Sequence, residues 1–436
     1  MTVKALKAFK DILPDESPAW RRLEDSARDV FARFGVEEIR TPVLEQTGLF
    51  ARSIGEETDI VAKEMYTFAD KNGASVTMRP EGTASVLRAF IEHGLHLRRP
   101  VSRLFTMGPM FRHERPQMGR LRQFHQISVE YIGSGHPLVD VEVMAMAHLL
   151  LQESGLRVRL EMNSLGCPAC RPRFRDHLTA FLKERGGDSA TLCDDCVRRT
   201  DTNPLRVLDC KKEPCRQLVA DAPSILDHLC DDCAAHLNQV KNGLTTLEVP
   251  FAMNPFMVRG LDYYCRTTFE FITDNLGAQS AVGAGGRYDG LVRQLGGQDL
   301  PGIGFAMGME RLLLLLEQQD GPAPAAAPAL AVLPIGDGAV ALALPLVHRL
   351  RADGVAVAAD FSGKSLKSQM KQAGKLDVRT VCIIGDDELH KKEAVLRDMA
   401  SGEQTPVSLA GTMAEIARRI GTNQHGWTIR ASHNKE

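Results

Sequence analysis

The stretch FRHERPQMGRLRQFHQISVEYIG, residues 111–133, opens with a concentration of positive charge. Its first half carries one acid, Glu114, among four arginines: Arg112, Arg115, Arg120 and Arg122. The whole chain gives no general reason for this, because 53 basic residues stand against 55 acidic ones, for a net charge of -2. A local cluster of guanidinium groups in a nearly neutral protein predicts a site for a bound anion, with phosphate oxygens as the best-matched partner.

The second half of the stretch alternates between polar and apolar residues with a period of two, which is typical of a β-strand. One face of this strand would carry Phe124, Gln126, Ser128 and Glu130. Two interpretations are open: a half-exposed strand with its polar side in water, or a sheet floor that lines a ligand cavity. The neighbouring loop with Arg112 and Arg120 favours the floor, because those side chains could clamp phosphate oxygens above it.

Four further short motifs contain candidate functional residues: TMRPEGTAS (77–85), VRGLDYYCRTTFEF (258–271), GAGGRYDGL (283–291) and GIGFAMGMERLLLLLE (302–317). Taken singly, each fits a structural role as well: a solvated turn, a tyrosine pair in the core beside a surface arginine, a bulged turn, and a core helix. None of them is a dinucleotide fingerprint or a phosphate-binding P-loop.

The length of 436 residues predicts two or three domains. Helices are predicted over residues 17–34, with Ser17 as cap and Pro18 as first helical residue, and over 137–153. Residues 166–241 hold eight of the ten cysteines and read as an insertion. The Pro/Ala-rich linker DGPAPAAAPA, 320–329, precedes an alternating α/β domain over 330–425, and a tail follows over 426–436.

Taken in order, these motifs resemble one known family. The segment through Pro42, the FRHER…RQF stretch and the GMER helix are similar to motifs 1, 2 and 3 of class II aminoacyl-tRNA synthetases. RGLDYYCRTTFEF and GGRYDGL resemble two stretches found in histidyl-tRNA synthetases. The resemblance spans residues 1 to about 425 and implies an α+β catalytic domain, with an antiparallel sheet flanked by helices, in two parts over 1–165 and 242–319. It also implies a helical Cys-rich insertion and a C-terminal α/β anticodon-binding domain.

The activity that the resemblance implies is ATP-dependent activation of histidine, followed by its transfer to the 3′ end of tRNA(His). Arg259, Arg112 and Arg311 match the family's catalytic arginines. ATP would be held by Arg112, Glu114, Arg120, Phe124 and Arg311, with Mg²⁺ sharing the phosphate charge. The α-ammonium group of histidine matches Glu81, Thr83 and Gln126, and its imidazole matches Glu130 and Tyr264, with Tyr263 and Tyr288 completing the wall.

The cysteines of the insertion form three C-x2-C pairs and one C-x4-C pair. Two C-x2-C pairs can complete a tetrahedral thiolate site, so a structural Zn²⁺ is one interpretation and reduced cysteines packed between helices is the other. The candidate ligands are Cys167, Cys170, Cys193, Cys196, Cys230 and Cys233. No catalytic role is expected for them.

The N-terminal sequence MTVKALKAFKDILP lacks an apolar signal segment, and no run is apolar enough to span a membrane, so we expect a cytoplasmic protein. The family resemblance adds an expected homodimer.

Two rival functions remain: a non-catalytic synthetase-like regulatory subunit of histidine biosynthesis, and a zinc-dependent RNA-binding module. The first would lack Arg259 and the C-terminal domain, and the second would not need Glu81, Gln126 and Glu130. Lys364, Lys367 and Lys371 are candidates for contact with the anticodon arm, although a solvated helix face is the better explanation of them.

Overall fold

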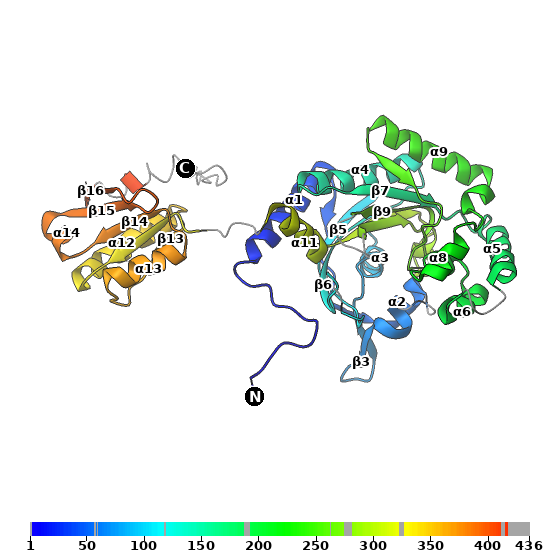
Figure 1. Ribbon diagram of the computed structural model, residues 1–436, viewed down its shortest axis with the longest axis horizontal. Helices are drawn as coiled ribbons and strands as arrows, with labels where there is room; N and C mark the ends of the chain where they lie inside the picture. Colours follow the sequence, from blue (N-terminus) through cyan, green and yellow to red (C-terminus); the bar gives the residue numbers. More distant parts are fainter. Residues whose placement is uncertain are drawn as a thin grey trace. The chain divides into compact units, whose positions relative to one another are not determined.

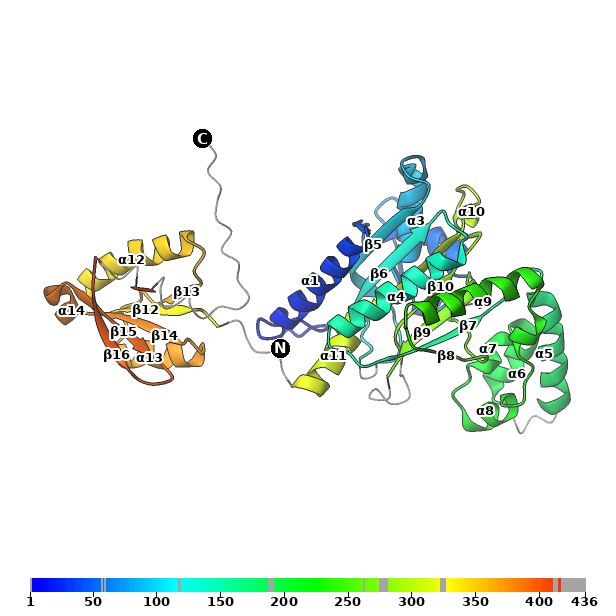
Figure 2. The ribbon, with the colours of Figure 1, turned by 90° about the horizontal axis from the view of Figure 1, so that it is seen from above.

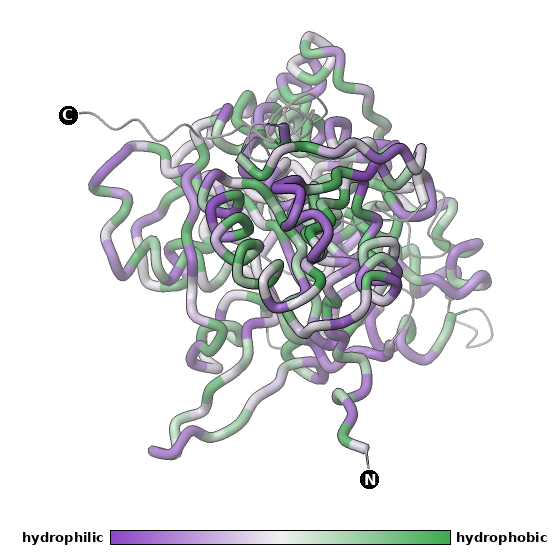
Figure 3. The backbone as a smooth tube through the Cα atoms, turned by 90° about the vertical axis from the view of Figure 1, so that its left-hand side faces the viewer, coloured by the Kyte–Doolittle hydropathy of each residue, from purple (hydrophilic) through white to green (hydrophobic). Residues whose placement is uncertain are grey.

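The computed structural model describes residues 2–55, 58, 60–116, 119–186, 192–261, 263–273, 281–321, 327–410 and 415–416. The chain divides into two compact units, Met1–Ala323 and Pro324–Glu436, each built on its own sheet (Figure 1). Hydrophobic and hydrophilic stretches alternate along the chain, as amphipathic elements require (Figure 3). No helix in the described ranges has the length and apolarity needed to cross a membrane.

The main sheet of the first unit has eight strands. In spatial order they are β1 (Glu37–Glu38), β5 (Ser102–Phe111), β6 (Gln123–Ile132), β11 (Gly302–Gly308), β10 (Ala281–Arg287), β9 (Cys265–Ile272), β7 (Arg159–Ser164) and β8 (Phe251–Met253). The six central strands pair antiparallel, as the family resemblance implied, while β1 and β8 add to the edges in parallel. The sheet is therefore mixed, with an antiparallel centre.

One face of this sheet is covered by helices (Figure 2). They are α1 (Ser17–Arg33), α4 (Pro137–Glu153), α9 (Asp231–Thr246) and α11 (Met309–Asp320). Their apolar residues form the main core with inward-facing residues of the strands, such as Phe105, Ile127 and Val129. The predicted 137–153 helix is confirmed. The prediction for α1 was one residue late: Ser17 is already helical, because both its N–H and its hydroxyl bond back to Leu13 O, so Glu16 occupies the cap position.

The opposite face of the sheet is only partly covered, which leaves room for a pocket. Here lie α3 (Thr83–Glu92), α2 (Thr47–Ile54), α10 (Leu291–Gln294), the π-helix η1 (Ile60–Glu64), the 3₁₀-helix η2 (Leu95–Leu97), and a small sheet of β2 (Leu44–Gln46), β4 (Ser75–Met78) and β3 (Tyr66–Ala69). Helix α3 packs Val86, Leu87 and Phe90 against β5 and β6. Its N-terminus is thereby fixed beside the strand that the sequence singled out.

The cysteine-rich segment is helical and lies at the β7–β8 end of the sheet (Figure 1). Its elements are α5 (Arg171–Gly186), α6 (Asp194–Thr202), α7 (Leu205–Leu208), α8 (Glu213–Val219) and the 3₁₀-helix η3 (Ile225–His228). They share a core with Tyr264 and Val258 of the main unit. Helix α9, which follows, runs to Thr246 and packs Val240 and Leu244 into the main core.

The second unit has a five-stranded sheet in the order β13-β12-β14-β15-β16. Its strands are β12 (Leu330–Pro334), β13 (Val357–Ala359), β14 (Thr380–Ile384), β15 (Glu393–Asp398) and β16 (Gln404–Ser408), and its helices are α12 (Asp337–Ala352), α13 (Leu366–Lys375) and α14 (Asp386–Lys391). The first three strands are parallel, and β15 and β16 add antiparallel. Strands β15 and β16 were not predicted from the sequence. Of residues 411–425 of the predicted α/β domain, the structure describes only Glu415 and Ile416, which are helical, and the predicted 426–436 tail lies outside the described residues.

Candidate active site

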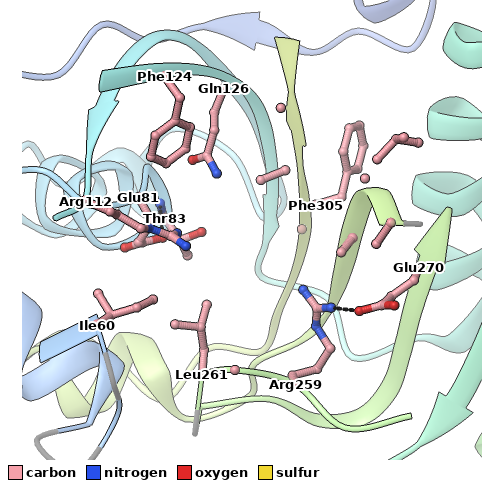
Figure 4. Close-up of a pocket in the computed structure, with 18 of the residues that line it drawn as sticks. Ile60, Glu81, Thr83, Arg112, Phe124, Gln126, Arg259, Leu261, Glu270 and Phe305 are labelled. Carbon is pink, nitrogen blue, oxygen red and sulfur yellow. Dashed lines mark hydrogen bonds and ion pairs between the residues drawn. The ribbon is translucent and has the colours of Figure 1, made fainter. Parts of the chain in front are cut away.

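A pocket of about 330 Å³ opens on the uncovered face of the main sheet. Strands β6, β9, β10 and β11 contribute to its lining, with the start of α3 and the segment from Arg259 to Tyr264 (Figure 4). This volume is typical of a site for a small ligand. Every residue predicted to contact histidine or ATP lines this one pocket: Glu81, Thr83, Arg112, Glu114, Arg120, Phe124, Gln126, Glu130, Arg259, Tyr263, Tyr264, Tyr288 and Arg311.

The polar face of β6 forms part of the pocket floor. Phe124, Gln126 and Glu130 line the pocket, while Ile127 and Val129 on the other face are fully buried in the main core. The strand is therefore not half-exposed. Among the described residues, Oε1 of Gln126 is buried and has no hydrogen-bond partner. A buried carbonyl without a donor is costly, so this position favours a ligand that supplies an N–H group.

Glu130 is held from two sides at the deep end of the floor. Thr83 Oγ1 donates to Glu130 Oε1 over 2.6 Å, and the Tyr288 phenol donates to Oε2 over 2.6 Å. Burial raises the pKa of Glu130 to about 8, although the bonds from Thr83 and Tyr288 counteract it. A carboxyl fixed in this way can still accept from a further N–H of a small polar ring.

Glu81 is a second buried carboxyl, 5% exposed, at the start of α3. Its oxygens accept from the backbone N–H groups of Thr83 and Ala84, both over 2.8 Å. Burial raises the pKa of Glu81 in spite of these bonds. A cationic ligand group beside Glu81 would reverse that penalty, because an opposite charge favours the ionised carboxylate.

Three arginines gather on the other side of the pocket from the turn after β5 and from α11. Burial lowers the pKa of Arg311, and the positive charges of Arg120 and Arg112 lower it further. Arg120 is paired with Glu114 over 2.8 Å. The Arg112 guanidinium lies 5.4 Å from the centroid of the Phe124 ring. Like charges held this close predict an anion between them, since an anion would relieve their repulsion.

Arg259 enters from the opposite wall and pairs with Glu270 of β9 (Figure 4). Burial would lower the pKa of Arg259, but the negative charge of Glu270 outweighs it, so the pKa is raised. Its guanidinium also lies 5.4 Å from the Tyr264 ring centroid. Among the described residues, its buried Nε has no hydrogen-bond partner. Arg259 is thus a fixed cation with a donor left for a ligand.

Sequence reasoning missed two carboxylates and a glycine of this pocket. Glu270 is the single charged side chain within the apolar run TTFEFI, which could have marked it. Glu310 accepts from the His125 backbone N–H over 2.9 Å and from its ring over 3.0 Å, and so joins α11 to β6. Gly304 sits so close to Glu130 that any side chain there would collide with the carboxylate. The sequence alone does not show that position 304 must lack a side chain.

The eight cysteines of the insertion form two separate groups of four. One unites Cys167 and Cys170 with Cys230 and Cys233, and the other unites Cys193 and Cys196 with Cys210 and Cys215. The candidate ligand set therefore omitted Cys210 and Cys215, since a C-x4-C pair was not matched to a C-x2-C partner. None of these eight described cysteines forms a disulfide.

The sulfur positions fit a tetrahedral metal site. The four sulfurs of each group lie within 4.8 Å of one another. Cys167 Sγ lies 3.6 Å from Cys170 Sγ and 3.9 Å from Cys230 Sγ, and Cys193 Sγ lies 3.9 Å from Cys210 Sγ. Four sulfurs about 2.3 Å from one zinc ion would be about 3.8 Å apart. Backbone N–H groups also donate to sulfur, from Cys230 to Cys170 and from Cys193 to Cys215.

An antiparallel sheet with a polar floor, an arginine cluster on one side and a buried arginine on the other defines the catalytic unit of a class II aminoacyl-tRNA synthetase. The histidyl-tRNA synthetase family profile matches residues 8–312, and the anticodon-binding domain profile matches residues 329–419. Because the first match covers more than half of the chain, the protein belongs to the histidyl-tRNA synthetase family.

Individual relatives agree over nearly the whole length. The histidine–tRNA ligase of Desulfotalea psychrophila is 59% identical over 410 residues, 94% of each chain. That of Trichlorobacter lovleyi is 54% identical over 416 residues, 95% of this chain and 98% of the relative. The crystal structure of apo S. aureus histidyl-tRNA synthetase superposes with a TM-score of 0.80 at 36% identity, covering 95% of this chain and 100% of that one.

Proposed function

We propose that this chain is an ATP-dependent histidine-tRNA ligase, which converts histidine to histidyl-adenylate and transfers the histidyl group to the 3′ end of tRNA(His). The observation that carries the proposal is the pairing, in one pocket, of a buried acceptor site around Glu130 with an arginine cluster suited to phosphates. Family membership and relatives of the same named activity support it.

ATP occupies the arginine side of the pocket. Arg112 contacts the α-phosphate region and Arg311 the γ-phosphate region, and Arg120 adds a third guanidinium. Phe124 stacks under adenine, and Glu114 faces the adenine amino group. Burial, and after it the positive charges of Arg120 and Arg112, lower the pKa of Arg311. This supports the assignment, because phosphate charge beside Arg311 would offset the repulsion among the arginines.

Histidine occupies the Glu130 side. Its α-ammonium group lies among Glu81, Thr83 and Gln126, and its imidazole bonds to Glu130 and Tyr264, enclosed by Tyr263 and Tyr288. Gln126 Oε1 has no hydrogen-bond partner in the described part of the chain, and the Glu81 carboxylate is buried. Both observations support the ammonium site. A site that hydrogen-bonds a polar ring rejects ligands lacking those groups by roughly 10⁴-fold, so no editing domain is needed.

In the first step a carboxylate oxygen of histidine forms a bond to the α-phosphorus of ATP, and the bond from that phosphorus to the pyrophosphate oxygen breaks. Two anions must meet, so positive charge is required at the reacting centre. Arg259, between the two half-sites, contacts the histidine carboxylate and the α-phosphate. In the second step a ribose hydroxyl of the terminal adenosine attacks the acyl carbon, and AMP leaves.

Synthetases of this class use ATP with Mg²⁺. The pocket lining also includes the carboxylates of Glu270 and Glu310, which are oxygen donors of the kind Mg²⁺ takes together with phosphates. When bound, the ion offsets phosphate charge. The chain's own residues position the nucleotide.

Each residue range of the chain is assigned a role in this reaction. Residues 1–165 and 242–319 carry catalysis, 166–241 form the insertion, 320–329 link the parts, 330–425 bind the anticodon end and 426–436 form a tail. The molecule works as a cytoplasmic homodimer. Zn²⁺ is the structural metal of the insertion, with one ion in each four-cysteine group, and cysteines without disulfides among the described residues suit a reducing compartment.

Charging of a total tRNA preparation with labelled histidine tests the function. Label in the tRNA fraction that depends on ATP and Mg²⁺ is expected, and its absence in a folded sample would favour a regulatory subunit. That rival is not favoured here, because the chain has Arg259 and matches the anticodon-binding profile.

A further inference from the structure

We infer that the two four-cysteine groups, each holding Zn²⁺, anchor the two ends of the segment from Arg259 to Arg266, so that metal occupancy controls histidine binding. This inference rests on the proposed function, because that segment carries Arg259, Tyr263 and Tyr264 of the histidine site. The structure describes all of the segment except residue 262, and none of the described residues from Arg259 to Tyr264 is in a helix or strand. Its position must therefore come from its neighbours.

The group of Cys167, Cys170, Cys230 and Cys233 holds the C-terminal end of the segment. Cys167 O accepts from the N–H groups of Cys170 and Arg171, and this turn orients the Arg171 side chain. The Arg171 guanidinium donates to Leu165 O over 3.1 Å and also to Tyr264 O. The Arg171 side chain thus links the turn that begins at Cys167 to the backbone of Tyr264, which we assign to the imidazole of histidine.

Two backbone bonds reinforce this end. Arg266 N–H donates to Gly166 O over 2.8 Å, and Leu165 N–H donates to Arg266 O over 2.7 Å. Arg266 has φ 48°, a left-handed conformation that non-glycine residues adopt only when their surroundings impose it. Gly166 has φ 61°, and a Cβ there would come within 2.8 Å of Cys170 Cβ. Gly166 therefore connects the turn from Cys167 to Cys170 directly to Arg266.

The group of Cys193, Cys196, Cys210 and Cys215 holds the N-terminal end. Cys193 is the N-cap residue of α6, and Cys210 follows the end of α7, with its N–H bonded to Val207 O over 3.1 Å. Between the two cysteine pairs, Arg206 of α7 donates to the backbone carbonyl of Arg259 over 3.1 Å. Arg206, which lies between the two cysteine pairs, therefore fixes the backbone of Arg259.

Hydrophobic packing also links the second cysteine group to this segment. Cys196, Cys210 and Cys215 belong to the same buried cluster as Val258 and Tyr264. The nucleotide side is built differently, because Phe124 lies on β6 and Arg311 on α11, both within the main sheet and helix layer. Loss of the ions should therefore impair histidine binding far more than ATP binding.

The test measures zinc content and ATP–pyrophosphate exchange on the full chain. We expect two zinc ions per wild-type chain. Arg206→Met keeps both ligand sets intact, so it should retain two zinc ions while KM for histidine rises about 10-fold, as expected for the loss of one part-buried hydrogen bond from a charged donor, with KM for ATP unchanged. Arg216→Met is the matched control: Arg216 is exposed on α8 of the same insertion, and its variant should match the wild type.

Cys230→Ser and Cys215→Ser should each lose one zinc ion and raise KM for histidine more than KM for ATP. Cys382→Ser should change neither, since Cys382 lies in the other unit. A wild-type chain without zinc, or an Arg206→Met variant with unaltered KM for histidine, overturns the inference. Absence of histidine-dependent exchange in the zinc-loaded wild type would instead reject the proposed function.

Discussion

Tyr288 donates its phenolic O–H to Glu130 over 2.6 Å, and both residues are only 1% exposed. The bond joins the turn after β10 to the floor strand β6, so it orients the carboxylate that we assign to the imidazole of histidine. Sequence separation gives no hint of this contact, since the residues are 158 positions apart.

Replacing Tyr288 with phenylalanine removes that donor without changing the ring. Glu130 then keeps Thr83 alone, and KM for histidine in pyrophosphate exchange should rise up to about 10-fold, as expected for the loss of one buried hydrogen bond. KM for ATP should not change. Tyr66→Phe, on β3 outside the pocket, is the control. Equal rises in both KM values would mean that Tyr288 supports the fold and not the histidine site.

The raised pKa of Glu130 predicts a pH-dependent stability. The folded chain holds this proton up to about pH 8, whereas the unfolded chain releases it near 4.5. The stabilising contribution is therefore present below pH 4.5 and lost as pH rises to about 8, by at most about 1.4 kcal/mol per pH unit. Glu130→Gln cannot titrate, so its stability relative to wild type should increase from pH 5 to 8 in urea unfolding. A constant difference would contradict the shift.

Gly304 should tolerate no side chain. A Cβ at this position collides with Glu130 Oε2 and with Val129 O, so Gly304→Ala must displace the floor, and histidine-dependent exchange should fall at least about 10-fold. The matched control is Gly48→Ala in α2, where a Cβ meets nothing within 4 Å. That helix position should gain up to about 1 kcal/mol, since alanine is the better helix former. Normal exchange in Gly304→Ala would refute the geometry.

Asp140 organises a buried charge network between α4, α9 and β10. Its carboxylate accepts from Arg287 Nε over 3.0 Å and bonds to His236 over 2.8 Å, and Asp140 and Arg287 are both fully buried. Asp140→Asn leaves Arg287 without its charge partner and should lower the free energy of unfolding by about 3–5 kcal/mol. Asp29→Asn, which affects an exposed pair with Arg33, should change it by less than about 0.5 kcal/mol. Comparable losses in urea unfolding would contradict this.

The sequence was most informative where a pattern is local. The alternation over 123–132 correctly assigned the faces of β6, and the helix over 137–153 was predicted at both ends. Strands β15 and β16 escaped because short strands in polar stretches are defined by the strands they pair with. The cysteine spacings showed that pairs exist, yet the pairing of 193/196 with 210/215 is a tertiary fact.

The site could be predicted only as a set of matching residues. Which of them share a cavity, and which are already engaged, depends on contacts over long separations, such as Thr83 to Glu130 and Arg259 to Glu270. The Glu114–Arg120 pair was not anticipated either, because sequence motifs do not report which charges neutralise one another.

Arg259 is the assigned catalytic residue at the centre of the pocket. Arg259→Ala should reduce adenylate formation at least about 10²-fold, since it removes a fixed cation from the reacting centre, while histidine and ATP still bind measurably by calorimetry. Arg52→Ala, on α2 outside the pocket lining, provides the control. Turnover near the wild-type level would remove Arg259 from the catalytic role.

The central claim is that one pocket activates histidine and no other amino acid. ATP–pyrophosphate exchange measured on the purified full chain with each of the twenty amino acids tests it most directly. The account predicts Mg²⁺-dependent exchange with histidine alone. Exchange with a different amino acid, or with none of them in a folded sample, would contradict it.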